Sequence, residues 1–145
     1  GEGDLRLWLV GDGPEEATFR AAAGADPHIV FKGFSPDALR WLAAADVFVH
    51  PSYHEGFSLS IIEAAMLAKP IVACDTGGNP EAVQDNQTGL LIPIKDASAL
   101  ATAMKRLAAD QPLRERLAKN ARANYEAHFR FETIVTEEFI PLYEK

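Results

Sequence analysis

The chain has 145 residues, of which 48% are hydrophobic and 24% charged, and its net charge is −7. These values are typical of one globular domain, and they argue against nucleic acid as a main partner, since duplex binding requires basic side chains. No apolar run reaches the ~18 residues of a membrane span, and no signal peptide is recognisable at the start. The single cysteine, Cys74, excludes an internal disulfide and is expected to be a small buried residue.

Short apolar runs alternate with helical patterns up to residue 92, and only helical patterns follow. Pro14 fits the first position of a helix, Ser35 and Pro36 begin a second helix, and Ser58 or Ser60 caps a third that extends to about Ala68. We expect strands at Leu5–Val10, His28–Phe31, Val47–His50, Pro70–Cys74 and Gly89–Ile92. We expect a short helix that starts at Asn79-Pro80-Glu81, and later helices at Asp96–Ala109, Pro112–His128 and Glu132–Tyr143.

This alternation predicts an α/β fold: a Rossmann-like, doubly wound parallel sheet followed by C-terminal helices. The strands are almost continuously apolar, as expected where helices cover both faces of a sheet. Ligands in such folds bind beyond the carboxyl ends of the strands, so the loops that follow the strands are where we expect a site.

The segment HPSYHEGFSLSIIEAA, residues 50–65, follows a strand and enters a helix. Gly56 allows the backbone to approach a ligand closely. Backbone N–H groups in the first turn of a helix have no partner within the helix, and the helix dipole favours an anion beside them. A diphosphate would suit this site, and the N–H groups concerned belong to Phe57, Ser58, Leu59 and Ser60.

Two carboxylates in this segment each allow two interpretations. Glu63 lies in the helix, where it could accept hydrogen bonds from the hydroxyls of a ribose, or it could form a capping box with Ser60. Glu55 lies in the loop, where it could face a ligand or be an ordinary solvated carboxylate.

Glu55 and Glu63 are separated by seven residues, and this segment resembles the E-x7-E signature of glycosyltransferase family 4, also called glycosyl transferases group 1. The stretches that flank it resemble the same family in the same order along nearly the whole chain. They are LVGDGPEE, VFKGFSPDALRWLAAADVFVHPS and PIVACDTGGNPEAVQDNQTGLLIP.

The resemblance implies one half of a GT-B fold, the C-terminal domain that binds a UDP-, GDP- or ADP-sugar. It implies that Glu63 holds the ribose, that Glu55 faces the transferred sugar as the catalytic residue, and that Gly56 to Ser60 cover the phosphates or the sugar. It also implies retention of anomeric configuration with no bound metal or other cofactor. The base would lie against Gly33, Phe34 and Ser35, and Gly77 and Gly78 would either shape the loop beside the site or form a tight turn.

The chain also departs from the family pattern. The family's first strand, with an arginine and a lysine that neutralise the diphosphate, and its N-terminal acceptor domain are not recognisable here. We therefore expect a donor-binding domain that is inactive alone, with a gap in the sheet. Another chain could fill the gap by strand complementation, a second copy could do so by self-association, or the flanking strands could pair directly. The last segment, FRFETIVTEEFIPLYEK, would carry a partly exposed apolar side.

Two alternatives remain: a binding module for nucleotides without catalysis, and an interaction domain without a ligand. A dehydrogenase is disfavoured, because Gly11-Asp12-Gly13 is followed by Glu16 where the fingerprint requires a third glycine. Nucleotide sugars are made in the cytoplasm, so we expect a cytoplasmic protein, with any attachment to the membrane periphery made by the other domain.

Overall fold

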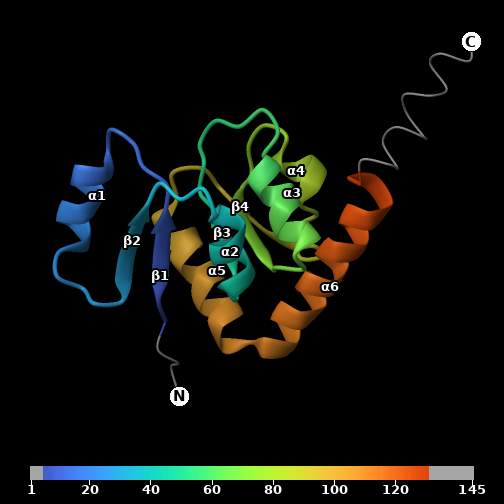
Figure 1. Cartoon of the computed structure of the whole chain (residues 1–145). Coiled ribbons are helices and arrows are strands. Elements are labelled where there is room, and N and C mark those ends of the chain that lie inside the picture. The colour runs from blue at the N-terminus through green and yellow to red at the C-terminus, as the bar shows by residue number, and fades with distance from the viewer. Residues whose placement is uncertain (1–4, 131–145) are drawn as a thin grey trace, which may run out of the picture. The chain divides into compact units, whose positions relative to one another are not determined.

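The computed structural model describes residues 5–130, and the chain divides between Ala44 and Ala45 into two compact units. Figure 1 shows the elements of both units in chain order. The prediction that residues 1–145 act as one nucleotide-sugar-binding domain stays a prediction.

Unit 1 contains a two-stranded parallel sheet and two short helices. Strand β1 (Leu7–Val10) pairs with β2 (Ile29–Gly33), and helix α1 (Glu16–Ala23) connects them. Helix α2 (Ala38–Ala44) follows β2. No residue of unit 1 that the structure describes is fully buried.

Cationic side chains lie over aromatic rings in unit 1. The Lys32 ammonium lies 4.3 Å from the centroid of the Trp41 ring and 5.4 Å from that of Trp8, and the two indoles meet edge to face at 5.5 Å. The Arg20 guanidinium lies 4.3 Å from the centroid of the Phe31 ring. Contacts of this kind contribute about 0.5–1 kcal/mol each where they are exposed, so they only partly replace a core.

Unit 2 contains a three-stranded parallel sheet in the order β3-β4-β5, with β4 in the centre. The strands are β3 (Phe48–His50), β4 (Ile71–Cys74) and β5 (Gly89–Ile92). The helices are α3 (Leu59–Met66), α4 (Asn79–Ala82), α5 (Ala97–Ala109) and α6 (Gln111–His128).

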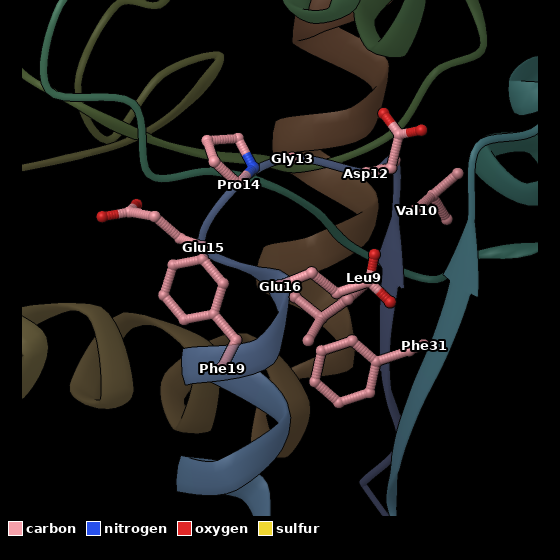
Figure 2. Close-up of a pocket in the computed structure, with 10 residues that line it drawn as sticks. Leu9, Val10, Asp12, Gly13, Pro14, Glu15, Glu16, Phe19 and Phe31 are labelled. Atoms are coloured by element: carbon pink, nitrogen blue, oxygen red, sulfur yellow. The ribbon is translucent and has the colours of Figure 1, made fainter.

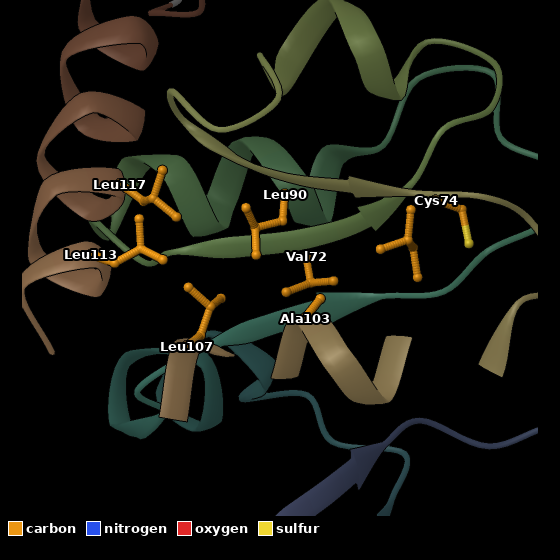
Figure 3. Packing of buried hydrophobic residues seen from close by; sticks show 8 residues of the cluster. Val72, Cys74, Leu90, Ala103, Leu107, Leu113 and Leu117 are labelled. Carbon is orange, nitrogen blue, oxygen red and sulfur yellow. The ribbon is translucent and has the colours of Figure 1, made fainter. Parts of the chain in front are cut away.

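The core of unit 2 has two faces because successive side chains of a strand point to opposite sides. Ile71 and Ala73 of β4 are completely buried, as is Ile61 of α3, the helix that packs against β4. Figure 3 shows the opposite face, where side chains of β4 and β5 meet those of α5 and α6. That cluster consists of Val72, Cys74, Leu90, Ile92, Ala103, Leu107, Leu113 and Leu117.

This arrangement confirms the α/β fold with parallel strands and helices on both faces of a sheet. Cys74 is buried, as expected, and its burial raises the pKa of the thiol. The strand at Gly89–Ile92 has the bounds that the sequence predicts, and Asp96 caps α5 by accepting a hydrogen bond from the N–H of Ala99 at 2.8 Å.

The starts of two helices and the end of a third differ from the expectation. Pro14 lies in a turn before α1, since the N–H of Glu16 donates to the carbonyl of Gly13 and the helix begins at Glu16. The Ser35 hydroxyl accepts from the N–H of Asp37, as a cap would, but α2 begins later, at Ala38. The third helix is capped by Ser58, and it ends at Met66 rather than near Ala68.

Each unit has a sheet of its own, β1–β2 in unit 1 and β3–β4–β5 in unit 2. How the place of the expected first strand is filled stays a prediction. The helix expected at Glu132–Tyr143 lies outside the described residues. Among residues 5–130, no helix is long and apolar enough to cross a membrane.

Candidate functional site

Three loops leave the same edge of the unit 2 sheet. They are residues 51–58 after β3, 75–78 after β4 and 93–96 after β5. Because the three strands are parallel and paired in the order β3-β4-β5, their carboxyl ends lie side by side. This is the edge at which ligands bind in open α/β sheets.

The start of α3 presents backbone donors at this edge. Ser58, which is 5% exposed, accepts a hydrogen bond from the N–H of Ile61 and so uses one donor of the first turn. Within residues 5–130, the four preceding N–H groups donate to no protein acceptor. These are the groups predicted to contact a diphosphate, those of Phe57, Ser58, Leu59 and Ser60.

Glu63 is the fifth residue of α3, about 6 Å along the helix axis from Leu59 at ~1.5 Å per residue. The capping box between Ser60 and Glu63 does not form, because Ser58 is the cap and Ser60 lies inside the helix. The carboxylate of Glu63 is partly buried and makes no hydrogen bond or ion pair with any other described residue. It therefore keeps its full capacity to accept hydrogen bonds from a ligand.

Glu55 is held inside the loop after β3. One of its carboxylate oxygens, Oε2, lies 2.8 Å from Nε2 of His50, the last residue of β3. The side chains of His50 and Glu55 are 19% and 25% exposed. An ordinary solvated carboxylate would be more exposed and would have no fixed partner. Sequence analysis did not identify His50, and the only signal for it is its position at the end of a strand, five residues before Glu55.

The glycine pair after β4 packs directly against the backbone of this loop. Gly77 has φ +53°, and a Cβ at this position would lie 1.6 Å from the carbonyl oxygen of Glu55. The N–H of Gly78 donates to the carbonyl of Gly56 at 2.9 Å, and a Cβ there would lie 2.3 Å from the same oxygen. The pair is more than a tight turn, because only glycine permits this close approach.

Other contacts hold the same loop. The Thr76 hydroxyl donates to the carbonyl of Tyr53 at 3.2 Å, and the Lys95 ammonium lies 5.9 Å from the centroid of the Tyr53 ring. The Phe57 ring lies 5.9 Å from that of Phe129, at the end of α6. His54 is exposed. The loop is thus fixed by the segments after β4, β5 and α6, which the sequence does not bring close together.

The remaining predicted contacts, Gly33, Phe34 and Ser35, lie at the end of β2 and directly after it, in unit 1. Gly33 has φ +68°, and its carbonyl accepts from the N–H of Gly11 at 2.8 Å. The Ser35 hydroxyl accepts from Asp37 and from the indole of Trp41, each at 3.2 Å, while Phe34 is 73% exposed. The Ser35 side chain is thus occupied within unit 1, which leaves the backbone and the Phe34 ring for a ligand.

Unit 1 also contains a pocket of about 480 Å³ that sequence analysis did not predict. It lies at the carboxyl end of β1, where Leu9, Phe31 and Phe19 surround its apolar part (Figure 2). Its polar lining is acidic, from Asp12, Glu15 and Glu16, and a negatively charged lining disfavours a phosphate group.

The family described as "Glycosyl transferases group 1" matches residues 1–110. The lipopolysaccharide core biosynthesis glycosyltransferase LpsE of Rhizobium meliloti is 34% identical over 139 residues, which cover 94% of this chain and 41% of LpsE.

Two solved structures are also similar. Alr3699/HepE of Anabaena in complex with UDP has a TM-score of 0.87 and 27% identity, over 97% of this chain and 41% of that one, and it has also been solved with UDP-glucose. Sucrose-phosphate synthase of Thermosynechococcus elongatus has a TM-score of 0.85 and 33% identity, over 96% of this chain and 38% of that one. The chain thus spans about two fifths of the length of each of these proteins.

Proposed function

Because this chain belongs to the glycosyl transferases group 1 family, we propose that it binds the donor of a glycosyl transfer, a nucleoside diphosphate sugar, at the carboxyl edge of β3–β4–β5. The observation that carries this proposal is the pairing of an open helix start with an unpartnered carboxylate one turn further along. N–H groups and a carboxylate in this order match the diphosphate and the ribose of one molecule.

The diphosphate would be bound by the N–H groups of the first turn of α3. These donors are fixed before the ligand binds, because the backbone of the loop that carries them packs against Gly77 and Gly78. Fixed donors aimed at an anion gain most when negative charge increases, as it does on a leaving diphosphate. The helix dipole acts in the same direction. This part of the site would therefore stabilise the leaving group as well as the bound donor.

The remaining roles rest on the family resemblance and on the geometry of single residues. Glu63 would accept hydrogen bonds from the ribose hydroxyls, and Glu55 would face the transferred sugar. Gly33, Phe34 and Ser35 would contact the base. We propose that the whole protein transfers sugar with retention of configuration and without a metal ion, and that this domain alone lacks transfer activity, since an acceptor domain must supply the second substrate.

The proposal is tested by comparing UDP with 2′-deoxy-UDP, since UDP is the nucleotide present in the Anabaena complex. A calorimetric titration should show weaker binding of the deoxy compound to the wild-type chain by about tenfold, the lower range for a hydrogen bond to a charged group. The variant Glu63→Ala should bind both compounds with equal affinity. GDP and ADP titrated in parallel would identify the base.

The matched control is Glu115→Ala, which removes a carboxylate from α6, outside the site. It should preserve the difference between UDP and 2′-deoxy-UDP. The proposal fails if the wild-type chain binds neither UDP, GDP nor ADP at millimolar concentration. It also fails if Glu63→Ala keeps the wild-type preference for UDP over 2′-deoxy-UDP.

A further inference from the structure

The carboxylate of Glu55 is hydrogen-bonded to a side chain of the sheet, that of His50. A loop carboxylate that is solvated by water does not need such a partner. His50 is the last residue of β3, and its ring stacks on that of Phe48, with 6.0 Å between ring centroids and 24° between ring planes. Residues i and i+2 of a strand share one face, so the strand itself orients the imidazole. The hydrogen bond from His50 to Glu55 is therefore anchored to the sheet rather than to another loop.

The chemistry of the pair sets the direction of the hydrogen bond. An ionised carboxylate can only accept, so Nε2 of His50 donates and Oε2 of Glu55 accepts, at 2.8 Å. The other oxygen, Oε1, has no hydrogen bond within residues 5–130. One oxygen of the carboxylate is thus held by the protein and the other is free to accept from a ligand hydroxyl.

The backbone of Glu55 is fixed as well. Its carbonyl oxygen packs so closely against Gly77 that a Cβ atom at position 77 would overlap with it. Backbone and carboxylate are thus anchored independently, the first by the loop after β4 and the second by the end of β3. A residue held at both ends loses little conformational freedom when a ligand binds, and pre-organisation of this kind increases affinity.

We infer that His50 is a positioning residue which orients the Glu55 carboxylate toward the sugar of the donor, and that it controls recognition of the sugar without affecting recognition of the nucleotide. The inference rests on the proposed function, because it assigns a partner to a residue of that same site. The contacts proposed for the diphosphate and the ribose lie at the start of α3 and within it, whereas His50 ends β3 and Glu55 lies in the loop between them. The two parts of the donor should therefore respond separately to substitution.

The first test requires no ligand. His50→Phe keeps an aromatic ring on Phe48 and removes the donor, while His50→Gln places an amide N–H near the position of Nε2. Heteronuclear ¹⁵N NOE values for residues 53–57 should fall in His50→Phe and remain at the wild-type level in His50→Gln. Unchanged values in His50→Phe would overturn the inference, because the loop would then not depend on the hydrogen bond.

The second test uses UDP and UDP-glucose on the same variants. The ratio of their dissociation constants should change about tenfold in His50→Phe, the lower range for loss of a hydrogen bond to a charged group, while the value for UDP stays constant. His50→Gln should restore the wild-type ratio. Glu55→Gln should change the ratio in the same way, and adding His50→Phe to Glu55→Gln should change it no further.

The matched control is His54→Phe, which removes an exposed histidine from the same loop and should leave the ratio unchanged. If His50→Phe weakens UDP and UDP-glucose equally, or if its effect persists in the Glu55→Gln background, His50 is only structural and the inference is overturned. If the wild-type chain binds neither UDP, GDP nor ADP, the proposed function fails and the assignment to the sugar fails with it. A wild-type chain that binds UDP and UDP-glucose, with an unaltered ratio in His50→Phe, contradicts the inference alone.

Discussion

The two units of this chain share one sequence pattern but differ in how they are packed. Among the described residues, every fully buried side chain lies in unit 2, where Leu107 and Leu117 are completely buried. In unit 1, Phe19 is 53% exposed and Leu39 43%. Within residues 5–130, unit 1 has two strands and two helices, whereas unit 2 has three strands and four helices. Helices α1 and α3 both have 8 residues, but only α3 has buried side chains. Alternation of strands and helices thus specifies the class of fold, but burial depends on how many elements pack together.

The largest effect that we predict is a difference in stability between the units. Both tryptophans, Trp8 and Trp41, lie in unit 1, and the single cysteine, Cys74, lies in unit 2. A two-stranded sheet alone is marginally stable, whereas typical domains have a free energy of unfolding of about 5–15 kcal/mol. The free energies of unfolding of unit 1 and unit 2 should therefore differ by on the order of 5 kcal/mol. Tryptophan fluorescence in urea should change well before Cys74 becomes reactive to a thiol reagent. Coincident transitions would show that the units unfold as one.

The next effect compares a buried with an exposed leucine. Leu117→Ala should destabilise unit 2 by about 2–5 kcal/mol, because it leaves a cavity in the cluster around β4 and β5. The control Leu39→Ala, in unit 1, should cost less than about 1 kcal/mol, since its side chain is already 43% exposed. The reactivity of Cys74 in urea measures the first variant and tryptophan fluorescence the second. Equal losses would contradict the assignment of the core to unit 2.

A smaller effect compares two glycines. Gly77→Ala would place a side chain in a left-handed backbone conformation against the Glu55 carbonyl, and should cost about 1–3 kcal/mol. It should also weaken UDP-glucose binding, because the loop that carries Glu55 must move. The control Gly13→Ala has no atom within 4 Å of the new Cβ and should change stability by less than about 0.5 kcal/mol. Thermal unfolding measures the stability of each variant, and calorimetry measures its affinity for UDP-glucose. If Gly77→Ala changes neither, the loop does not depend on close packing between Gly77 and the Glu55 carbonyl.

The smallest effect concerns the cation over the indoles of unit 1. Lys32→Met removes the charge that lies over Trp41 and Trp8 but keeps an unbranched chain, and should cost about 0.5–1 kcal/mol. Tryptophan fluorescence in urea gives the midpoint for unit 1. The control Lys119→Met, on the exposed side of α6, should not change that midpoint. A Lys32→Met chain with the wild-type midpoint would mean that the apolar contacts alone hold unit 1.

The sequence by itself determined what depends on a few neighbouring residues. Apolar runs bounded by turn residues located the strands of the described residues, and the helical pattern over Asp96–Ala109 located α5. The order of the motifs around Glu55 and Glu63 indicated the family, and family membership was confirmed. These features are local because backbone dihedral angles and side-chain periodicity are set within one or two turns of the chain.

The tertiary structure alone decided which residues complete the candidate site. Both Ser58 and Ser60 can cap a helix, and only the path of the loop after β3 selected Ser58 and removed the capping box from Glu63. The contact between Thr76 and Tyr53 joins residues 23 positions apart, and it exists because β3 and β4 are neighbours in the sheet. Because β3 and β4 are neighbours, the backbone of Glu55 also packs against Gly77. Such contacts depend on strand order and on packing between elements, which no short stretch of sequence encodes.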